Sequence, residues 1–570
     1  MNRSLCIFLT QMILLVVGLL GLLACHANYD VTPTPQPIAE KMEQIDSFRG
    51  ENERRNLDHA ISDNVTYMAM GDRVTTAAMQ FPGPACRLRL SDIILTTLKN
   101  NRNIRVESYS LDITEDSIEA AKGIYDLLME GSWNYRRSRS QTPIWDGPDA
   151  REEDDLIESK YYQSAYEVIL SQLISTGGQL QFFGGYQNTR TYSGASRMNP
   201  FPVDPYNTWY LGAGIMHPLL KGLGAYVTNA PIQIERVNDK IAEEEFRAQV
   251  IDQIATAVQL YWDYIFALDN YEVQRLSLER ARESLRVTMV KNEAGVEPPN
   301  VVLQAEAEVS RREALLIDAQ RAIADTADQL KRAMNISESS KEWQYNLIPL
   351  DRPSVSPVNL DNERIYREAL DYRPDYRAAL LGRDLAQIDK NVNKNAKLPQ
   401  LNATADFRLT GLADSSGKAI DSVETGNYYD WGVGLNFQFP LQNRRAEALY
   451  RQAESSVMQS DEQLKLIKEV IRLEVRSTVR AIEASLKSIA AFEANVRAEE
   501  AKLDSQLKRY DVGFATIFEV LDFQEDLANA QVNYLQAVVN YNKALIELQR
   551  VKASLLQDMN IQALEAESGQ

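Results

Sequence analysis

The sequence predicts an α+β membrane protein built from two tandem repeats, each of which supplies amphipathic strands and one long helical hairpin. Three observations support this class: apolar residues recur every seventh position at matching places in two halves, segments of period two precede each long helix, and an apolar leader ends at a cysteine. A strict spacing of seven keeps one side of a helix against a partner helix. A period of two gives a strand one apolar and one polar face.

The composition excludes several classes of function. The chain has 570 residues, and 80 acidic against 61 basic side chains give a net charge of −19, which argues against a nucleic-acid partner. Only three histidines and three cysteines occur, and the sequence contains no HExxH, CxxC or GxxxxGK[ST] motif. We therefore predict that the protein is not an enzyme, with no catalytic residues, no metal site and no non-covalent cofactor.

Residues 1–24 have the pattern of an export signal, with Arg3 followed by an apolar run that ends in Ala24 and Cys25. A membrane anchor helix is the alternative, but only 13 residues separate Gln11 from Cys25, fewer than the ~20 that span a bilayer. A small residue before cysteine resembles a bacterial lipoprotein signal, which implies covalent lipid on Cys25; a plain secretory cleavage is the other possibility. Residues 25–87 then form a lipidated tether and extension.

Two helical hairpins are predicted around Gly295 and Gly513. The helices before these glycines cover about 225–293 and 443–511, and about 70 helical residues make a rod of roughly 100 Å. An ordinary helical bundle would use shorter helices with more glycine and proline between them. The heptad rows are Val250, Ala257, Tyr264, Tyr271, Leu278 and Leu285; Val302, Val309, Leu316, Ile323 and Leu330; Val475, Ile482, Ile489, Val496, Leu503 and Tyr510; and Val520, Leu527, Tyr534, Tyr541 and Leu548.

Four strands are predicted, two in each repeat. They are Tyr125 to Tyr135, Leu180 to Tyr192, Leu401 to Leu409 and Tyr429 to Phe439. Their apolar faces suit either a soluble sandwich or a membrane barrel, and their lengths, aromatic residues and charged polar faces favour the barrel. Four strands cannot close a barrel, and open edges are not tolerated in lipid, so several chains must contribute to one barrel.

Several motifs recur in order along most of the chain and carry a family resemblance. They are Leu90-Ser91-Asp92-Ile93 through Asn100-Asn101, Thr176-Gly177-Gly178, Met216-His217-Pro218-Leu219-Leu220-Lys221-Gly222, Tyr372-Arg373-Pro374-Asp375, Lys397-Leu398-Pro399-Gln400-Leu401, and Arg509-Tyr510-Asp511-Val512-Gly513 leading to Val520-Leu521-Asp522. From about residue 88 to 557 the chain resembles the TolC-type outer-membrane efflux channels.

The resemblance implies a homotrimer with a twelve-stranded transmembrane β-barrel, four strands per chain, continuous with a twelve-helix periplasmic tunnel. The first repeat would cover 88–336 and the second 373–557, each with a helix, two barrel strands and a long hairpin. A short helical belt would occupy 337–372, and 558–570 would be a C-terminal tail.

The same resemblance implies passive conduction from the periplasm to the exterior, with energy supplied by an inner-membrane pump and docking by a periplasmic adaptor. The protein would then be lipid-anchored in the outer membrane, with its tunnel in the periplasm. The cargo and the pump class, proton-driven or ATP-driven, stay open. The competing hypothesis is a soluble periplasmic coiled-coil scaffold or adaptor lipoprotein.

The candidate site is the pair of hairpin tips, where Gly295 and Gly513 permit a sharp reversal of the chain. The resemblance places adaptor docking at these tips, makes Tyr510 part of a closing lock, and assigns Glu519 and Asp522 to an acidic ring at the entrance. Ala515, Asn300 and Val301 replace other members of the lock. The alternatives are glycines that merely end helices and an acidic pair on a solvated surface. His217 is expected to be structural or exposed and not a metal ligand. Arg136 to Arg139 is expected to be a solvated loop end or a contact to lipid headgroups.

Overall fold

The computed structural model describes residues 84–143, 156–193, 203–356, 358 and 360–558. All of them belong to one structural unit, Tyr67–Gln570. The predicted leader, Cys25 and most of the tether lie outside the described residues, as does the tail from residue 559. No described helix combines the length with the apolarity that a bilayer crossing requires.

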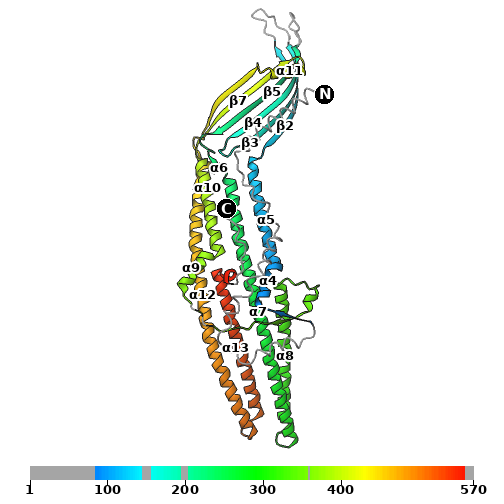
Figure 1. Ribbon diagram of the computed structural model, residues 1–570, viewed down its shortest axis with the longest axis vertical. Helices are drawn as coiled ribbons and strands as arrows, with labels where there is room; N and C mark the ends of the chain where they lie inside the picture. Colours follow the sequence, from blue (N-terminus) through cyan, green and yellow to red (C-terminus); the bar gives the residue numbers. More distant parts are fainter. Residues whose placement is uncertain (1–83, 144–155, 194–202, 357, 359, 559–570) are drawn as a thin grey trace, which may run out of the picture. The chain divides into compact units, whose positions relative to one another are not determined.

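The two predicted hairpins are confirmed. Every member of their heptad rows is buried or half-buried, and Ala257, Ile482 and Tyr541 are wholly inaccessible to solvent. The first hairpin packs against the second through α7 and α13 (Figure 1). The four helices are α7 (Ala230–Glu293), α8 (Pro299–Ala333), α12 (Arg444–Asp511) and α13 (Ile517–Lys552).

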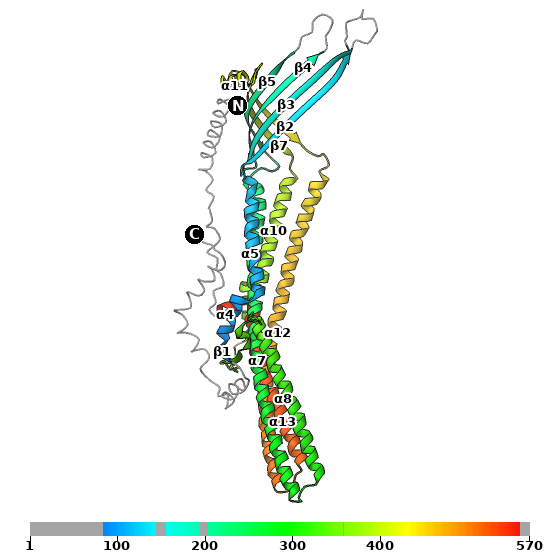
Figure 2. The same ribbon diagram turned by 90° about the vertical axis from the view of Figure 1, so that its right-hand side faces the viewer.

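Shorter helices lead from each half of the chain into the strands. Asn101 caps α5 by accepting from the N–H of Asn103 and Ile104, and Asp361 caps α9 in the same way. α5 and α10 both pack on α7, beside the part of it that lies nearer the strands (Figure 2). The elements are α4 (Leu90–Asn100), α5 (Arg102–Lys122), η2 (Gly123–Tyr125), α6 (Ala225–Thr228), α9 (Asn362–Tyr372), α10 (Pro374–Ala396), α11 (Ser416–Glu424) and α14 (Leu555–Asp558).

The strands form one six-stranded antiparallel sheet in the order β2-β3-β4-β5-β7-β8, with β2 and β8 at its edges. α11 covers one end of β5 and β7, where a Cβ on Gly411 would lie 2.0 Å from the carbonyl oxygen of Ala419. Only glycine fits that approach. The strands are β2 (Leu128–Pro143), β3 (Leu156–Leu173), β4 (Gln179–Ser193), β5 (Val203–Pro218), β7 (Gln400–Ala413) and β8 (Tyr429–Gln438).

The predicted count of four strands per chain is wrong, because the sheet has six. The prediction missed β3 and β5. β3 carries Ala165 and Ile169 on its polar side, which blurs the alternation, and β5 contains Pro205 and two glycines, which read as turn residues. The basic cluster from Arg136 to Arg139 lies inside β2 and not at a loop end. The first strand begins at Leu128, because η2 occupies Gly123–Tyr125.

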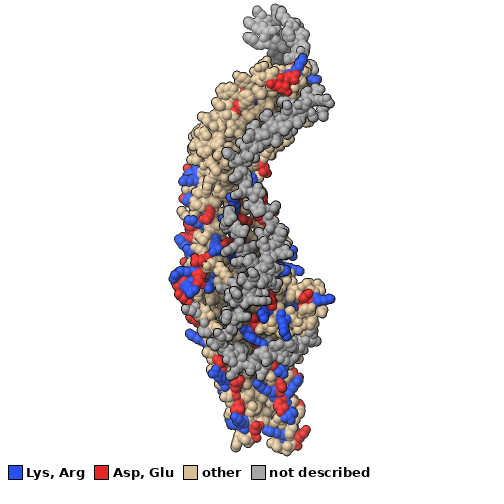
Figure 3. Space-filling model, in the orientation of Figure 1, with Lys and Arg blue, Asp and Glu red and all other residues tan. Residues whose placement is uncertain are grey.

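The register divides the sheet into two chemically distinct faces. The apolar face carries an aromatic row across four strands, Trp133, Tyr166, Tyr186 and Trp209. On β8 the same face carries Trp431, opposite Phe407 of β7. The polar face carries, among others, Ser132, Asn134, Glu167, Gln187, Asp406, Arg408 and Asp430. In Figure 3 the sheet shows few charged atoms, whereas the helices carry many of both signs.

Residues 337–372, where the resemblance implied a short helical belt, are helical only in part. They hold a 3-10 turn (η3, Lys341–Gln344), a strand (β6, Asn346–Pro349) and α9. β6 pairs in parallel with β1 (Ala85–Leu88), and its buried Leu347 and Ile348 join the main apolar core around α7. The hydroxyl of Tyr264 donates to the carbonyl oxygen of Leu347 at 2.7 Å. This segment therefore ties the start of the described chain to the middle of α7.

Candidate functional site

The two hairpin tips have the same backbone geometry. Gly295 (φ +73°) and Gly513 (φ +82°) are left-handed residues that follow α7 and α12 after one intervening residue. In each tip the next N–H closes a Schellman motif, from Val296 to the carbonyl of Lys291 and from Phe514 to that of Arg509, both at 2.8 Å. A Cβ on either glycine would meet no atom within 4 Å, so the requirement for glycine is one of backbone conformation. The predicted sharp reversal is confirmed.

Glu519 belongs to a capping box at the start of α13. Thr516 accepts from the N–H of Glu519, while the Glu519 carboxylate accepts from the N–H of Thr516 at 2.9 Å and from Gln506 Nε2 at 3.0 Å. The hydrogen bond from the Thr516 backbone is the main cause that lowers the pKa of Glu519. This carboxylate stays ionised and also fixes the helix start, a role that the TxxE pattern alone could have indicated.

An acidic stripe continues from Glu519 along the exposed side of α13 through Asp522 to Asp526. The spacing of three and four residues places these carboxylates on one side of the helix. The pKa of Asp526 is raised, first by desolvation and then by repulsion from Asp522 and Glu499. Negative charge is therefore concentrated beside the tip, and Asp526 and Glu499 extend the pair that the sequence singled out.

Tyr510 connects the two tips within one chain. Its side chain is 4% exposed, and the Lys291 ammonium nitrogen lies 3.5 Å from the centre of its ring. This is a cation–π contact between the end of α7 and the end of α12. The Tyr510 hydroxyl is buried and has no hydrogen-bond partner among the described residues. Tyr510 thus acts through its ring, and Lys291 is a partner that sequence reasoning missed.

Two of the three positions that depart from the lock implied by the resemblance have a structural explanation. Ala515 and Val301 pack against an apolar cluster that includes Tyr510, Ile517 and Leu521. Apolar contact and the Lys291 cation therefore hold these tips together, in place of a polar network at those positions.

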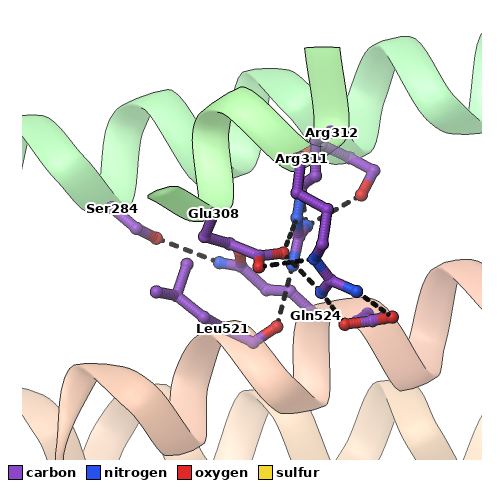
Figure 4. Close-up of polar contacts among 8 residues, drawn as sticks. Ser284, Glu308, Arg311, Arg312, Leu521 and Gln524 are labelled. Carbon is purple, nitrogen blue, oxygen red and sulfur yellow. Dashed lines mark hydrogen bonds and ion pairs between the residues drawn. The ribbon is translucent and has the colours of Figure 1, made fainter. Parts of the chain in front are cut away.

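A buried arginine joins three helices just above the tips (Figure 4). Arg312 on α8 is 2% exposed and donates to Ser277 Oγ of α7 at 2.7 Å and to the carbonyl oxygen of Leu521 on α13 at 2.8 Å. Its Nε donates to Glu308 at 2.6 Å. A second polar bridge runs beside it, from Gln524 Nε2 of α13 to Ser284 Oγ of α7 at 3.2 Å.

Charge is balanced inside this cluster. Burial alone would raise the pKa of Glu308. Its carboxylate accepts hydrogen bonds from Arg311 and Arg312, and these outweigh the effect of burial, so the pKa is lowered. Arg311 also pairs with Glu525 on α13. With all of these partners, the buried Arg312 links the two hairpins through specific hydrogen bonds. No pattern in the sequence signals it, because its partner on the second hairpin, Leu521, lies 209 residues away.

His217 has a structural place, as predicted. Its Nε2 lies 2.9 Å from Thr176 Oγ1 and its Nδ1 2.8 Å from the carbonyl oxygen of Pro218. Both ring nitrogens thus face hydrogen-bonding atoms where β5 ends beside the β3–β4 turn.

Comparisons with known proteins agree on one family. The family model described as outer membrane efflux protein matches residues 187–335 and 365–553. The outer membrane protein TolC of Escherichia coli K12 is 26% identical over 308 residues, which cover 51% of this chain and 61% of that relative. The Campylobacter jejuni CmeC outer membrane channel has the same fold with a TM-score of 0.58 at 15% identity, over 82% of this chain and 86% of CmeC. The outer membrane protein VceC of Vibrio cholerae gives 0.57 at 15% identity, over 81% and 96%. The chain therefore belongs to the outer membrane efflux protein family.

Proposed function

We propose that this outer-membrane protein is the exit duct of a tripartite efflux or secretion system, through which substrates pass passively from the periplasm to the exterior. Its partners would be a periplasmic adaptor and an inner-membrane pump. The long hairpins supply a tunnel wall, and the two-faced sheet supplies a wall in lipid. The names of the relatives, an outer membrane protein and an outer membrane channel, support this reading.

One observation carries the proposal: the sheet exposes its apolar face and ends in two open edges. Trp133 and Trp431, on the two edge strands, are 63% and 64% exposed. Such aromatic side chains suit the lipid-facing side of a barrel, and the opposite polar face suits a water-filled lumen. Unpaired edge groups are costly in lipid, so the edges must pair with other copies. We take the assembly to be a homotrimer built from two internal repeats, as the resemblance implies.

The hairpin tips would form the entrance and the adaptor-docking surface. Threefold symmetry would turn Glu519, Asp522 and Asp526 of α13 into acidic rings that favour cations over anions. The Lys291–Tyr510 contact and the Arg312 cluster would hold each chain's hairpins together and so keep the entrance narrow.

Lipid on Cys25 would be a membrane anchor additional to the barrel, and its removal gives a direct test of the function. The Cys25→Ser variant is expected to stay in the membrane fraction after a carbonate wash, because a barrel remains embedded without its lipid. The solubilised variant should keep a native mass three times that of the chain. Release into the wash, or a stable monomer, would instead support the soluble scaffold.

The tip contact makes a second prediction. Replacing Tyr510 with Leu, or Lys291 with Gln, is expected to raise the open probability of single channels in planar bilayers about 2- to 30-fold, since a cation–π contact is worth about 0.5 to 2 kcal/mol. Tyr510→Phe is the matched control: it keeps the ring and loses only a hydroxyl without a described partner. Equal opening by the Phe and Leu variants would show that the ring is not the active group.

A further inference from the structure

The two halves of the chain contribute unequal numbers of strands. Four strands (β2 to β5) lie between α5 and α7, whereas two (β7 and β8) lie between α10 and α12. The additional strands, β2 and β3, are long, and β2 is paired along its whole length: every residue from Leu128 to Pro143 has a partner on β3. β3 is in turn paired with β4 from Ser159 to Leu173. The additional hairpin is thus a continuous part of the sheet.

This hairpin has the two faces that a barrel wall needs. On the apolar face, the Trp133 and Tyr166 rings stack with centroids 6.4 Å apart, and the row continues to Tyr186 at 6.3 Å and to Trp209 at 5.0 Å. On the other face the hairpin carries Ser132, Asn134, Arg136, Gln163 and Glu167, whereas Arg137, Arg139 and Lys160 lie on the aromatic face, on the β2–β3 loop side of the row. The aromatic row therefore runs at one level from the additional hairpin onto β4 and β5. A hairpin lying outside the wall would expose Arg136, Gln163 and Glu167 to lipid, which is costly.

The sheet's two edges are complementary to each other. Six antiparallel strands make β2 and β8 run in opposite directions, so β8 of one copy can pair with β2 of the next in the antiparallel manner of the rest of the sheet. An odd number of strands would make that seam parallel. Both edge strands are exposed along almost their whole described length.

We propose that three copies close an eighteen-stranded barrel through β8–β2 seams, with the additional hairpin widening the wall. The occupant of each open edge is a second copy of this chain. This inference rests on the proposed duct function and departs from the twelve strands implied by the resemblance. Barrel diameter grows roughly in proportion to strand number, so the membrane segment would be about 1.5 times as wide as a twelve-stranded one. Barrels of 16 to 18 strands hold an aqueous channel, which leaves the hairpin tips as the narrow point.

Disulfide cross-linking across the seam tests the proposal in the full-length, membrane-inserted protein with Cys86 replaced by Ser. Each of three polar-face variants on β2 is combined with each of two on β8, and these six pairs sample six successive same-face registers of the seam. In at least one pair, oxidation is expected to convert most of the protein into covalent dimers and trimers. A reductant should return these to monomers by breaking the disulfides. The variants are Ser132→Cys, Asn134→Cys and Arg136→Cys with Asp430→Cys and Asn436→Cys.

Polar-face positions on β4 provide the matched control, because Gln187 lies in the same row as Asn134. Gln181→Cys and Gln187→Cys, combined with the same β8 variants, should give no covalent oligomers. Links from β4 in place of β2 would mean that β4 forms the seam, and would overturn the wide barrel while leaving the duct intact. A trimer with no link from β2 in any register would overturn it as well.

A density map of the solubilised trimer gives an independent count of strands in cross-section. Eighteen strands are expected, and twelve would overturn the inference without touching the proposed function. A monomer in the same preparation would contradict both. The two proposals therefore fail in distinguishable ways.

Discussion

Replacing Arg312 with Met is expected to destabilise the packing of the two hairpins by about 3 kcal/mol. The variant leaves the buried Ser277 hydroxyl and the Leu521 carbonyl without their donor and takes one of two arginines from Glu308. Breaking a buried, hydrogen-bonded charge pair costs about 3 to 5 kcal/mol, and the remaining Arg311 favours the lower end. The check is thermal unfolding of the trimer in detergent, followed by its helical circular dichroism.

Arg311 offers the matched control, because it is adjacent on α8 and its side chain is 49% exposed. Arg311→Met should cost less than about 1 kcal/mol, as exposed ion pairs usually do. A double variant, Arg312→Met with Glu308→Gln, should lose less than the sum of the two single losses if the residues act as a pair. Equal losses for Arg311→Met and Arg312→Met would show that burial does not matter here.

The long helices could be predicted because their signal is local and repeated. A heptad row places apolar residues on one side of a helix for many turns, so it predicts a long helix. The glycines predicted where each helix ends, and α7 ends at Glu293 and α12 at Asp511. Strand prediction failed where the alternation was broken by residues tolerated in a sheet, namely Pro205, the glycines of β5 and the apolar residues on the polar side of β3. A pattern of period two over a dozen residues has too few repeats to absorb such exceptions.

At the tips, too, some features could be predicted from the sequence and others could not. The turn glycines and the Thr516–Glu519 capping box are local motifs that can be recognised in the sequence. Lys291 and Arg312 act through partners on another hairpin, at Tyr510 and Leu521, and a single sequence gives no distances between hairpins. The acidic stripe is intermediate: its spacing is visible, but the crowding of Asp526 by Glu499 depends on how α12 packs on α13.

We expect the free energy of unfolding to depend on pH in an unusual way because of Asp269. It lies on α7, is 7% exposed, and burial is the main cause that raises its pKa to about 7, with opposition from Arg352 and reinforcement from Glu272. The unfolded chain titrates near 3.8, so between these values the folded state holds a proton that the unfolded state has lost. Stability conferred by the neutral form is therefore lost as the pH rises toward 7.

Asp269→Asn is expected to stabilise the protein at pH 8 by up to about 4 kcal/mol, since each pKa unit corresponds to about 1.36 kcal/mol. The amide resembles the protonated carboxyl in shape and carries no charge, so the gain should be small at pH 4 and grow between pH 4 and 7. Unfolding midpoints in denaturant at pH 4, 6 and 8 measure this difference. Asp318→Asn, whose side chain is 68% exposed on α8, should change stability by less than about 0.5 kcal/mol at each pH. A variant that is no more stable than the parent at pH 8 would mean that Arg352 already compensates the buried charge in full.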